Sequence, residues 1–345
     1  MDKVRTIGLD LAKNVFQVHG IDETGQVVVR KQLRRAEVIR FFSKLPRCLI
    51  GMEACGSSHY WARELVELGH AVRLIPASAV KPYVKHGKKN DATDAAAICE
   101  AVGRPHMQWV PIKTEEQQAV LMLHRARELL VGQRTTLVNA LRAHLAELGI
   151  VAAQGFAAFK TLTVVVHDDT DVRLPMIARS ALKLLARQIE EVSDRINVLE
   201  KDILTWHKSN EASCRLASIP NIGPITASAV VATVGDDVER FASGRRFASW
   251  LGIVPSQNST GGKTCLGRIT KAGDRYLRTL LVTCATGAVR YANRKVPGGD
   301  WFAKLLAKKG KGKVRLVTVA LANKFARIIW ALLKKGTTYQ AMAEA

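Results

Sequence analysis

Acidic residues are scarce in this chain relative to basic ones. The 345 residues include 30 Asp and Glu against 52 Lys and Arg, which gives a formal net charge of +22 and a pI near 10.0. Such a surplus repels itself in a compact protein and therefore indicates a polyanionic partner. Nucleic acid is the commonest partner of this kind, and an acidic membrane surface is the alternative.

Signatures of several other protein classes are missing. The six cysteines form no C-x-x-C pair and the nine histidines show no ligand-like spacing, which argues against a structural zinc site. We expect reduced thiols, mostly in the core. The N-terminal MDKVRTIGLD is no signal peptide, and Pro220, Gly223 and Pro224 interrupt the uncharged run from Leu216 to Gly235. The sequence therefore predicts a soluble, cytoplasmic protein rather than a membrane protein.

The first hundred residues follow a strand-and-helix pattern that starts with the apolar run Val4 to Asp10. Two further strands are separated by a turn that contains Gly25, which favours a hairpin. The later expected elements are a helix at 36–44, a strand at 48–52, a helix at 57–68, a strand at 71–75 and a helix at 91–102. This order fits a mixed sheet with helices on its faces. It is also the order of the ribonuclease H-like fold, by analogy.

The rest of the chain is mainly helical in pattern. Apolar residues recur at threes, fours and sevens over residues 114–149 and again over 177–206, which fits a coiled coil or two helices of one bundle. Residues 150–175 are expected to form a loop with short structure of its own, and helices are expected at 274–289 and 317–333. We expect three domains, at residues 1–112, 113–210 and 211–345.

Four carboxylates of the first part are candidates for one site. Asp10 ends the first strand and Glu53 directly follows the strand 48–52, so both emerge at one sheet edge if these strands are neighbours. Asp91 and Asp94 are three residues apart and share a helix face. Clustered acids repel one another unless cations lie between them, and oxygen ligands select Mg²⁺ or Mn²⁺. Such ions serve phosphodiester chemistry, whereas each acid taken alone fits a solvated surface charge or a helix cap equally well.

A second candidate site is the turn PSQNSTGGK, residues 255–263. Two glycines after a Ser-Thr pair let the backbone approach a ligand closely. Ser259 fits either of two roles, passive phosphate binding or nucleophilic attack on a phosphate. Residue chemistry alone favours passive binding, because no nearby histidine supplies a base. The candidate nucleic-acid contacts around this turn are Thr260, Gly261, Gly262, Lys263, Arg268, Lys271, Arg275 and Arg278.

Two further segments are candidates for nucleic-acid contact. The run IPNIGP, with Gly223, is similar to a helix-hairpin-helix turn whose backbone amides approach a phosphate, although a buried helical turn fits as well. Residues 304–315 contain six basic residues and no acid, which fits a solvated charge run or a loop that grips a backbone. The candidate contacts there are Lys308, Lys309, Lys311 and Lys313.

These motifs together resemble a known family. GLDLAK, GMEACGSSHYWA and KNDATDA, followed by IPNIGPITA and PSQNSTGGKTCLGRITKAGDRYLR, are similar to the DEDD transposases of bacterial insertion sequences, the "insertion-sequence one-ten" type. The resemblance covers nearly the whole chain. It implies a RuvC-like N-terminal domain of ribonuclease H fold, in which Asp10, Glu53, Asp91 and Asp94 hold Mg²⁺. It also implies that Ser259 is a nucleophile that forms a covalent 5′-phosphoserine link to DNA.

The resemblance further implies the partners. Members of this family act as dimers and tetramers that pair the acidic site of one subunit with the serine of another. An element-encoded bridge RNA base-pairs with donor and target DNA, and the helices of residues 114–206 would supply dimer contacts. Two rivals remain: a junction or flap nuclease of the same fold that uses metal-activated water, and a nucleic-acid-binding protein without catalysis.

Overall fold

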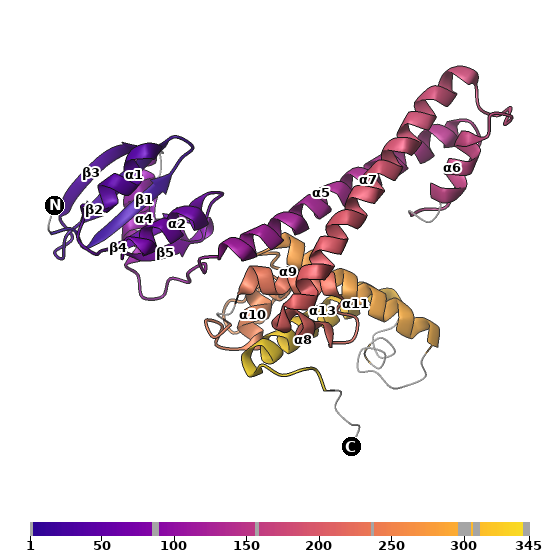
Figure 1. Ribbon diagram of the computed structural model, residues 1–345. Coiled ribbons are helices and arrows are strands. Elements are labelled where there is room, and N and C mark those ends of the chain that lie inside the picture. Colours follow the sequence, from indigo (N-terminus) through magenta and orange to yellow (C-terminus); the bar gives the residue numbers. More distant parts are fainter. Residues whose placement is uncertain are drawn as a thin grey trace. The chain divides into compact units, whose positions relative to one another are not determined.

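The computed structural model describes residues 3–84, 90–155, 159–235, 238–295, 305 and 311–340, with the side chains of 291–295 and 311 left outside the description. The chain forms two compact units, Met1–Glu115 and Glu116–Ala345 (Figure 1). The boundary between them lies close to the first of the two predicted domain boundaries. The second, at residue 210, stays a prediction.

The first unit is built on a five-stranded mixed sheet with strand order β3-β2-β1-β4-β5. The strands are β1 (Thr6–Leu11), β2 (Val15–Ile21), β3 (Val27–Arg34), β4 (Leu49–Glu53) and β5 (Ala71–Ile75). The three N-terminal strands pair antiparallel, while β1, β4 and β5 run parallel to one another. This confirms the predicted mixed α/β region and its hairpin, and the finer ribonuclease H-like assignment stays a prediction.

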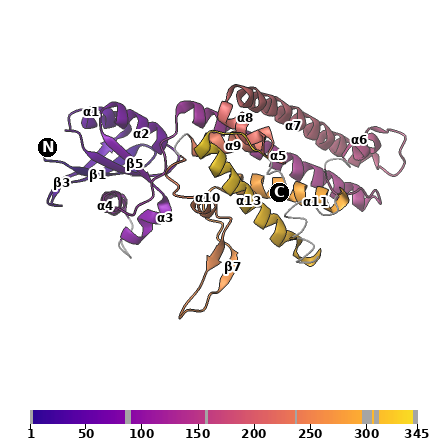
Figure 2. The ribbon, with the colours of Figure 1, turned by 90° about the horizontal axis from the view of Figure 1, so that it is seen from below.

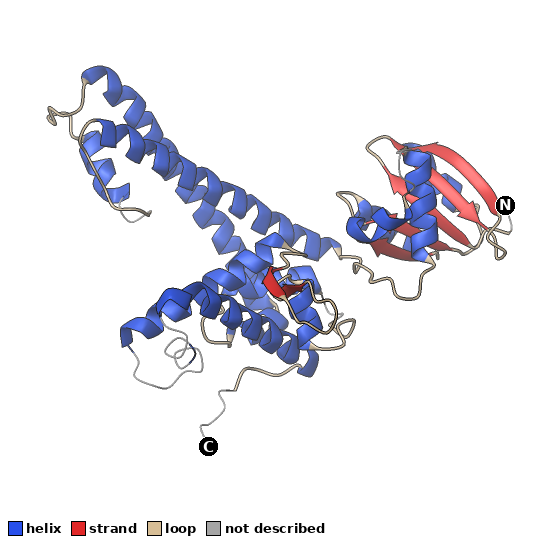
Figure 3. Ribbon diagram, turned by 180° about the vertical axis from the view of Figure 1, so that it is seen from behind, coloured by secondary structure: helices blue, strands red, loops and turns tan. Residues whose placement is uncertain are grey.

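Helices cover both faces of this sheet (Figure 3). They are η1 (Arg35–Glu37), α1 (Val38–Phe42), α2 (Ser58–Glu67), α3 (Ala77–Val80), η2 (Lys81–Tyr83) and α4 (Asp91–Val102). On one face, Phe42 of α1 and Leu65 of α2 share a core with Ile7 and Leu9 of β1. Because successive strand residues point to opposite faces, Gly8 and Asp10 point to the other face, which α4 covers.

The second unit is helical. Its helices are α5 (Glu115–Glu147), α6 (Phe159–His167), α7 (Met176–Ser209), α8 (Glu211–Ala217), α9 (Pro224–Val234), α10 (Gly244–Trp250), α11 (Arg275–Lys295), η4 (Lys311–Lys313) and α13 (Val314–Lys335). Leu141 and Leu145 of α5 share a core with Leu182 and Ile189 of α7, so the two long helices pack along one another. This confirms two long helices, whereas a coiled-coil geometry stays a prediction.

The C-terminal helices of this unit enclose a second core. Apolar residues of α8, α9, α10, α11 and α13 form one buried cluster, and α9 is buried along nearly its whole length. Among the described helices, α13 alone is long and apolar enough to cross a membrane. Its residues Val317, Leu321, Phe325 and Ile329 belong to the buried cluster, so packing inside the protein accounts for its apolar character.

The structure also corrects some details of the sequence analysis. Residues 150–175 contain the short helix α6, which fits the expected loop with short structure of its own. The expected serine turn, in contrast, is part of a two-stranded sheet, β6 (Pro255–Gln257) and β7 (Leu266–Ile269). The prediction that most thiols lie in the core was wrong. Cys48 and Cys99 are buried, whereas Cys214 and Cys265 are exposed, and the remaining two are intermediate.

Candidate functional sites

The register of the central strands places Asp10 and Glu53 side by side. Strands β1 and β4 are parallel, with Gly8 opposite Gly51 and Leu9 opposite Met52. Asp10 and Glu53 are the next residues of their strands, and each lies two positions beyond a glycine that contacts α4. The side chains of both acids therefore lie on the α4 face of the sheet.

Helix α4 begins next to this pair. Its first turn carries Asp91 and Asp94, and the Asn90 side chain caps the helix by accepting a hydrogen bond of 2.8 Å from the Thr93 amide. The helix runs antiparallel to β1, because Cys99 near its C-terminal end donates to the carbonyl of Thr6 at the start of the strand. Acids in the first turn of a helix are favoured by its dipole.

The close fit of α4 on the sheet depends on two glycines. A Cβ atom at Gly8 would lie 2.0 Å from the carbonyl oxygen of Ala95, and one at Gly51 would lie 2.7 Å from the Cβ atom of Val102. The two glycines are partners across β1 and β4 and form a flat platform without side chains. The helix can therefore lie close to the strands, which brings its first turn toward Asp10.

Burial and neighbouring charges perturb Asp10 strongly. Its pKa is raised from 3.8 to about 6, first by burial and then by repulsion from Asp94, Asp91 and Glu53. The three other carboxylates thus lie within electrostatic reach of Asp10. Within the described ranges, no three Asp, Glu, His or Cys side chains are close enough together to hold a metal ion.

Ser259 lies at the tip of the β6–β7 hairpin, which extends from the helices of its unit (Figure 2). The tip turn runs from Thr260 to Lys263, whose amide donates a 3.0 Å hydrogen bond back to the Thr260 carbonyl. The central residues Gly261 and Gly262 have φ values of 56° and 77°, as a two-residue hairpin turn of type I′ requires. The glycines thus build a defined turn that exposes Ser259 to solvent.

The Ser259 hydroxyl accepts a 3.1 Å hydrogen bond from the Cys265 amide. Within the described residues this is the one side-chain hydrogen bond recorded for Ser259, and its own proton therefore stays available. The chain has no acid from residue 240 to residue 273. The hairpin thus presents a hydroxyl in a basic segment and supplies no carboxylate of its own to act as a base.

The base of the hairpin is held by a tight backbone contact. A Cβ atom at Gly252 would lie 2.1 Å from the carbonyl oxygen of Ala272, and one at Gly273 would lie 1.9 Å from the carbonyl oxygen of Trp250. Arg278 ties the same segments together by donating 3.0 Å hydrogen bonds to the carbonyls of Leu251 and Ala272. Its guanidinium, which sequence reasoning assigned to nucleic acid, is thus engaged within the protein.

The other predicted cationic contacts fall into two groups. Lys263, Arg268, Lys271 and Arg275 are exposed on the hairpin or just beyond it, as is Lys313 at the end of η4. Lys308, Lys309 and the side chain of Lys311 lie outside the described residues. Gly223 is the N-cap of α9, and a side chain there would meet open space. The helix-hairpin-helix role of its turn stays a prediction.

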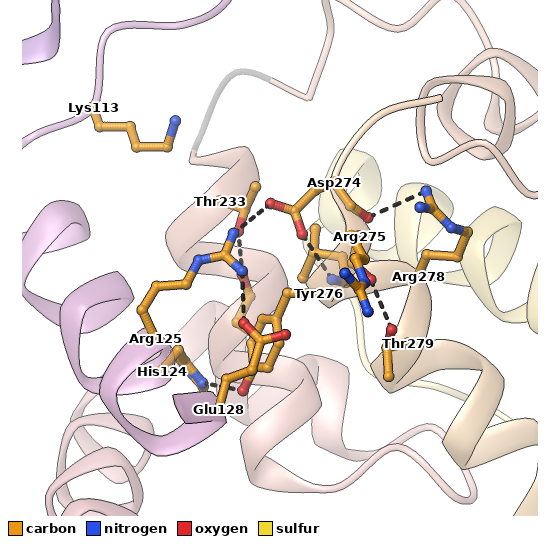
Figure 4. Close-up of polar contacts among 12 residues, drawn as sticks. Lys113, His124, Arg125, Glu128, Thr233, Asp274, Arg275, Tyr276, Arg278 and Thr279 are labelled. Carbon is orange, nitrogen blue, oxygen red and sulfur yellow. Dashed lines mark hydrogen bonds and ion pairs between the residues drawn. The ribbon is translucent and has the colours of Figure 1, made fainter. Parts of the chain in front are cut away.

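Sequence reasoning missed a buried polar network around His124 of α5 (Figure 4). The His124 ring lies 3.1 Å from both the Tyr276 hydroxyl and the Ser228 hydroxyl. Because Ser228 donates its proton to the Pro224 carbonyl, we assign Nε2–H of His124 as donor to Ser228 and Nδ1 as acceptor from Tyr276. A histidine at a core position of the helical pattern was the available signal.

The same network anchors the helix that follows the hairpin. Arg125 forms a 2.9 Å ion pair with Asp274, whose other oxygen accepts a 2.9 Å hydrogen bond from the Leu277 amide at the start of α11 (Figure 4). Burial, with help from Arg127 and Arg125, lowers the pKa of His124 from 6.5 to about 4, so the ring is neutral at pH 7. The contacts fix α5 to α9 and α11.

Comparison with known proteins identifies the class. A model of DEDD transposases matches residues 7–150, and the model described as "Transposase IS116/IS110/IS902 family" matches residues 213–297. The first match contains the four acids of the candidate metal site, and the second contains the β6–β7 hairpin with Ser259. The chain is a transposase, an enzyme that cleaves and joins DNA.

Full-length relatives agree with this assignment. The chain is 50% identical to a "Probable family 20 transposase" of Pseudomonas aeruginosa, over 97% of this chain and 98% of the relative. It is 37% identical to the "Transposase for insertion sequence element IS1328" of Yersinia enterocolitica, over 98% and 99% of the two chains. The corresponding protein of IS1111A from Coxiella burnetii is also 37% identical, over 99% and 93%. The chain belongs to the IS116/IS110/IS902 transposase family.

Proposed function

We propose that this transposase cuts and rejoins DNA at a site in which Asp10, Glu53, Asp91 and Asp94 hold Mg²⁺ or Mn²⁺. The observation that carries the proposal is the placement of Asp10 and Glu53 on neighbouring parallel strands that face α4, whose first turn holds Asp91 and Asp94. The raised pKa of Asp10 agrees with this placement. The donor set fits such an ion, because it consists of carboxylate oxygens whose repulsion a cation would relieve. When bound, the ion would supply charge stabilisation at the oxygens of the scissile phosphate.

The second part of the proposal is that Ser259 is the nucleophile. Its Oγ attacks phosphorus and forms an Oγ–P bond while the bond from phosphorus to the 3′-oxygen breaks. The serine proton passes through solvent to the leaving 3′-oxygen, which leaves a 3′-hydroxyl and a 5′-phosphoserine. Rejoining reverses these steps with another 3′-hydroxyl. The exposure of Ser259 and its role as acceptor toward the Cys265 amide support this assignment.

Basic residues would hold the DNA around the serine. Lys263, Arg268, Lys271 and Arg275 are exposed on or near the hairpin, where they can neutralise phosphate charge. Arg278 would contribute indirectly, because its hydrogen bonds to Leu251 and Ala272 fix the base of the hairpin. Backbone amides at the turn before Gly223 would approach a further phosphate.

The partners complete the proposal. A bridge RNA encoded by the element would select donor and target DNA, and the net charge of +22 suits a protein that holds two kinds of nucleic acid. Dimers that assemble into tetramers would bring the acidic site of one subunit to the serine of another. The lack of an acid between residues 240 and 273 supports this arrangement, because the hairpin needs carboxylates from elsewhere.

The test is a denaturing gel of end-labelled donor DNA incubated with the protein, Mg²⁺ and the RNA transcribed from the flank of its gene. We expect a slowly migrating adduct that protease removes. Ser259→Ala and Asp10→Asn should each abolish the adduct, whereas Ser256→Ala in the same hairpin should retain it.

The three outcomes separate the proposal from its rivals. An adduct that survives in Ser259→Ala would refute the serine assignment. Cleavage without any adduct would indicate a nuclease that uses water. Binding without cleavage at any Mg²⁺ concentration, with every flanking transcript supplied, would leave a nucleic-acid-binding protein without catalysis.

A further inference from the structure

A trough lined by both polar and apolar residues opens on the α4 face of the first unit, beside the acidic site. It has a volume of about 810 Å³ and lies between α4 and the uncovered faces of β2 and β3. We call it the amide trough, and its argued lining residues are Gln17, His19, Arg30, Gln32, Tyr83 and Asn90. All of these residues belong to the first compact unit.

The sheet register joins the trough to Asp10. Asp10 pairs with Gln17 across β1 and β2, and Gln17 pairs with Gln32 across β2 and β3. Residues paired in this way share a face, and neighbouring strands are about 4.8 Å apart. The two amides therefore form a straight row that leads away from Asp10, reaching about 10 Å at Gln32.

A second row on the same face carries the cation of the trough. Gly8 pairs with His19, and His19 pairs with Arg30. Burial and the nearby charge of Arg30 both lower the pKa of His19, so that ring stays neutral at pH 7. Arg30 is exposed, and in the part of the chain that the structure describes it forms no ion pair with an acid. Its charge is available to an anionic ligand.

The lining chemistry indicates one class of ligand. Glutamine and asparagine amides both donate and accept hydrogen bonds, as base edges require, and an aromatic ring such as Tyr83 can stack on a base. An arginine suits a phosphate. The volume falls within the range of roughly 300 to 1,000 Å³ typical of small-molecule sites, which suits a few nucleotides of one strand and is too small for a duplex.

We propose that the amide trough binds a single DNA strand that leads into the Asp10 site, with its bases on the Gln17–Gln32 row and a phosphate on Arg30. This inference rests on the proposed function for the identity of the strand. The trough holds the nucleotides next to the scissile phosphate in an unpaired state, and the rows of the sheet set their direction. Arg30 and Gln32 are thus positioning residues, which bind the strand without touching the reacting atoms.

The first test is site-specific crosslinking with the full-length protein. A photoreactive p-benzoylphenylalanine replaces Gln32 in one variant and Arg40 in another, since Arg40 is exposed on α1, which packs on the opposite face. Each variant is irradiated with a labelled single-stranded DNA oligonucleotide in EDTA. We expect at least fivefold more crosslinking from position 32. Equal yields, or crosslinking from position 32 to an RNA of the same sequence only, would refute the proposal.

The second test measures binding to the same oligonucleotide by fluorescence anisotropy across a range of KCl concentrations. Losing one phosphate contact should reduce the slope of log K against log salt by about 0.7 in Arg30→Ala. Gln32→Ala should weaken binding roughly tenfold without a change of slope. Arg40→Ala removes the same charge from the other face and should leave the slope within error of the wild type.

The outcome of these two experiments does not depend on whether the proposed function is correct. They use no divalent cation and require no cleavage, so a chain without the serine chemistry would still give the predicted binding and crosslinks. Conversely, an Arg30→Ala protein with an unchanged salt slope and full adduct formation would refute the trough and leave the serine mechanism intact.

Discussion

The glycine platform under α4 allows a sharp test of how the acidic site is built. Gly8→Ala adds one methyl group whose carbon would lie 2.0 Å from the Ala95 carbonyl oxygen and 2.4 Å from the Cys99 amide nitrogen. Both atoms belong to the backbone of α4, so no rotamer change relieves the clash. Cβ atoms essentially never approach such atoms within 3.0 Å, so the helix must move by at least 1.0 Å, the difference between 3.0 and 2.0 Å.

The expected cost follows from this geometry. Overpacking a well-packed interface costs about 1 to 3 kcal/mol, and a backbone clash of this size belongs at the upper end, near 3 kcal/mol. Gly51→Ala needs a shift of only 0.3 Å, the difference between 3.0 and 2.7 Å, against the Val102 side chain, and should cost about 1 kcal/mol. Gly103→Ala is the matched control, because its nearest contact would be 3.9 Å away and its φ is −80°.

Hydrogen exchange in increasing urea measures these costs for the first unit alone, through peptides from β1 and α4. A second readout is the increase in melting temperature when Mg²⁺ is added. This increase should depend on the distance from Asp10 to the first turn of α4, because both carry proposed ligands of the ion. We expect Gly8→Ala to lose this rise and Gly103→Ala to keep it. A Gly8→Ala protein as stable as Gly103→Ala, with the same response to Mg²⁺, would refute the packing argument.

Two further predictions concern the second unit. The pKa of His124 is about 4 in the folded protein and 6.5 in the unfolded chain, so the unfolded chain binds the proton first as the pH falls. The free energy of unfolding is therefore unaffected above pH 6.5 and falls by up to about 3 kcal/mol as the pH drops toward 4. Urea unfolding between pH 7.5 and 4.5 should show this loss, and His124→Gln should flatten the profile. Gly262→Val forces a β-branched residue to a φ of 77° and should speed hydrogen exchange of the Lys263 and Cys265 amides, whereas Gly262→Asn should leave it nearly unchanged.

Much of the first unit could be predicted from sequence because its signals are local and strong. Alternating residues at 15–21 and 27–34 and a Gly25 turn specify the hairpin, and apolar runs into Asp10 and Glu53 specify the central strands. The proximity of Asp10 and Glu53 then follows from topology, since parallel neighbouring strands end at one edge. The glycine platform could not be predicted this way, because the sequence does not show that a helix packs on the sheet at Gly8 and Gly51.

The second unit was harder to predict, for identifiable reasons. The β6 and β7 strands are short and almost wholly exposed, so they carry no apolar alternation that would predict them. Gly261 and Gly262 indicated a close approach of the backbone to a ligand, whereas the structure uses them in a tight turn. The type of the short structure within residues 150–175 could not be predicted, because α6 contains the run Val164–Val166, which has strand-like propensity. Packing of Leu162 and Val166 against the core stabilises it as a helix. In α6, tertiary contacts therefore outweigh local preference.

Ser259 and Arg278 lie in the same segment, but the sequence predicts the role of the serine better than the role of the arginine. A serine near two glycines is informative because the glycines allow the tight turn that places Ser259 at the exposed tip of the hairpin. An arginine in a basic segment is ambiguous, since five donors serve a phosphate or backbone carbonyls equally well, and Arg278 takes the carbonyls of Leu251 and Ala272. Its loss should therefore disturb the hairpin even without DNA, whereas loss of the exposed Lys263 should weaken DNA binding alone. The distinction rests on burial and partners, which composition does not encode.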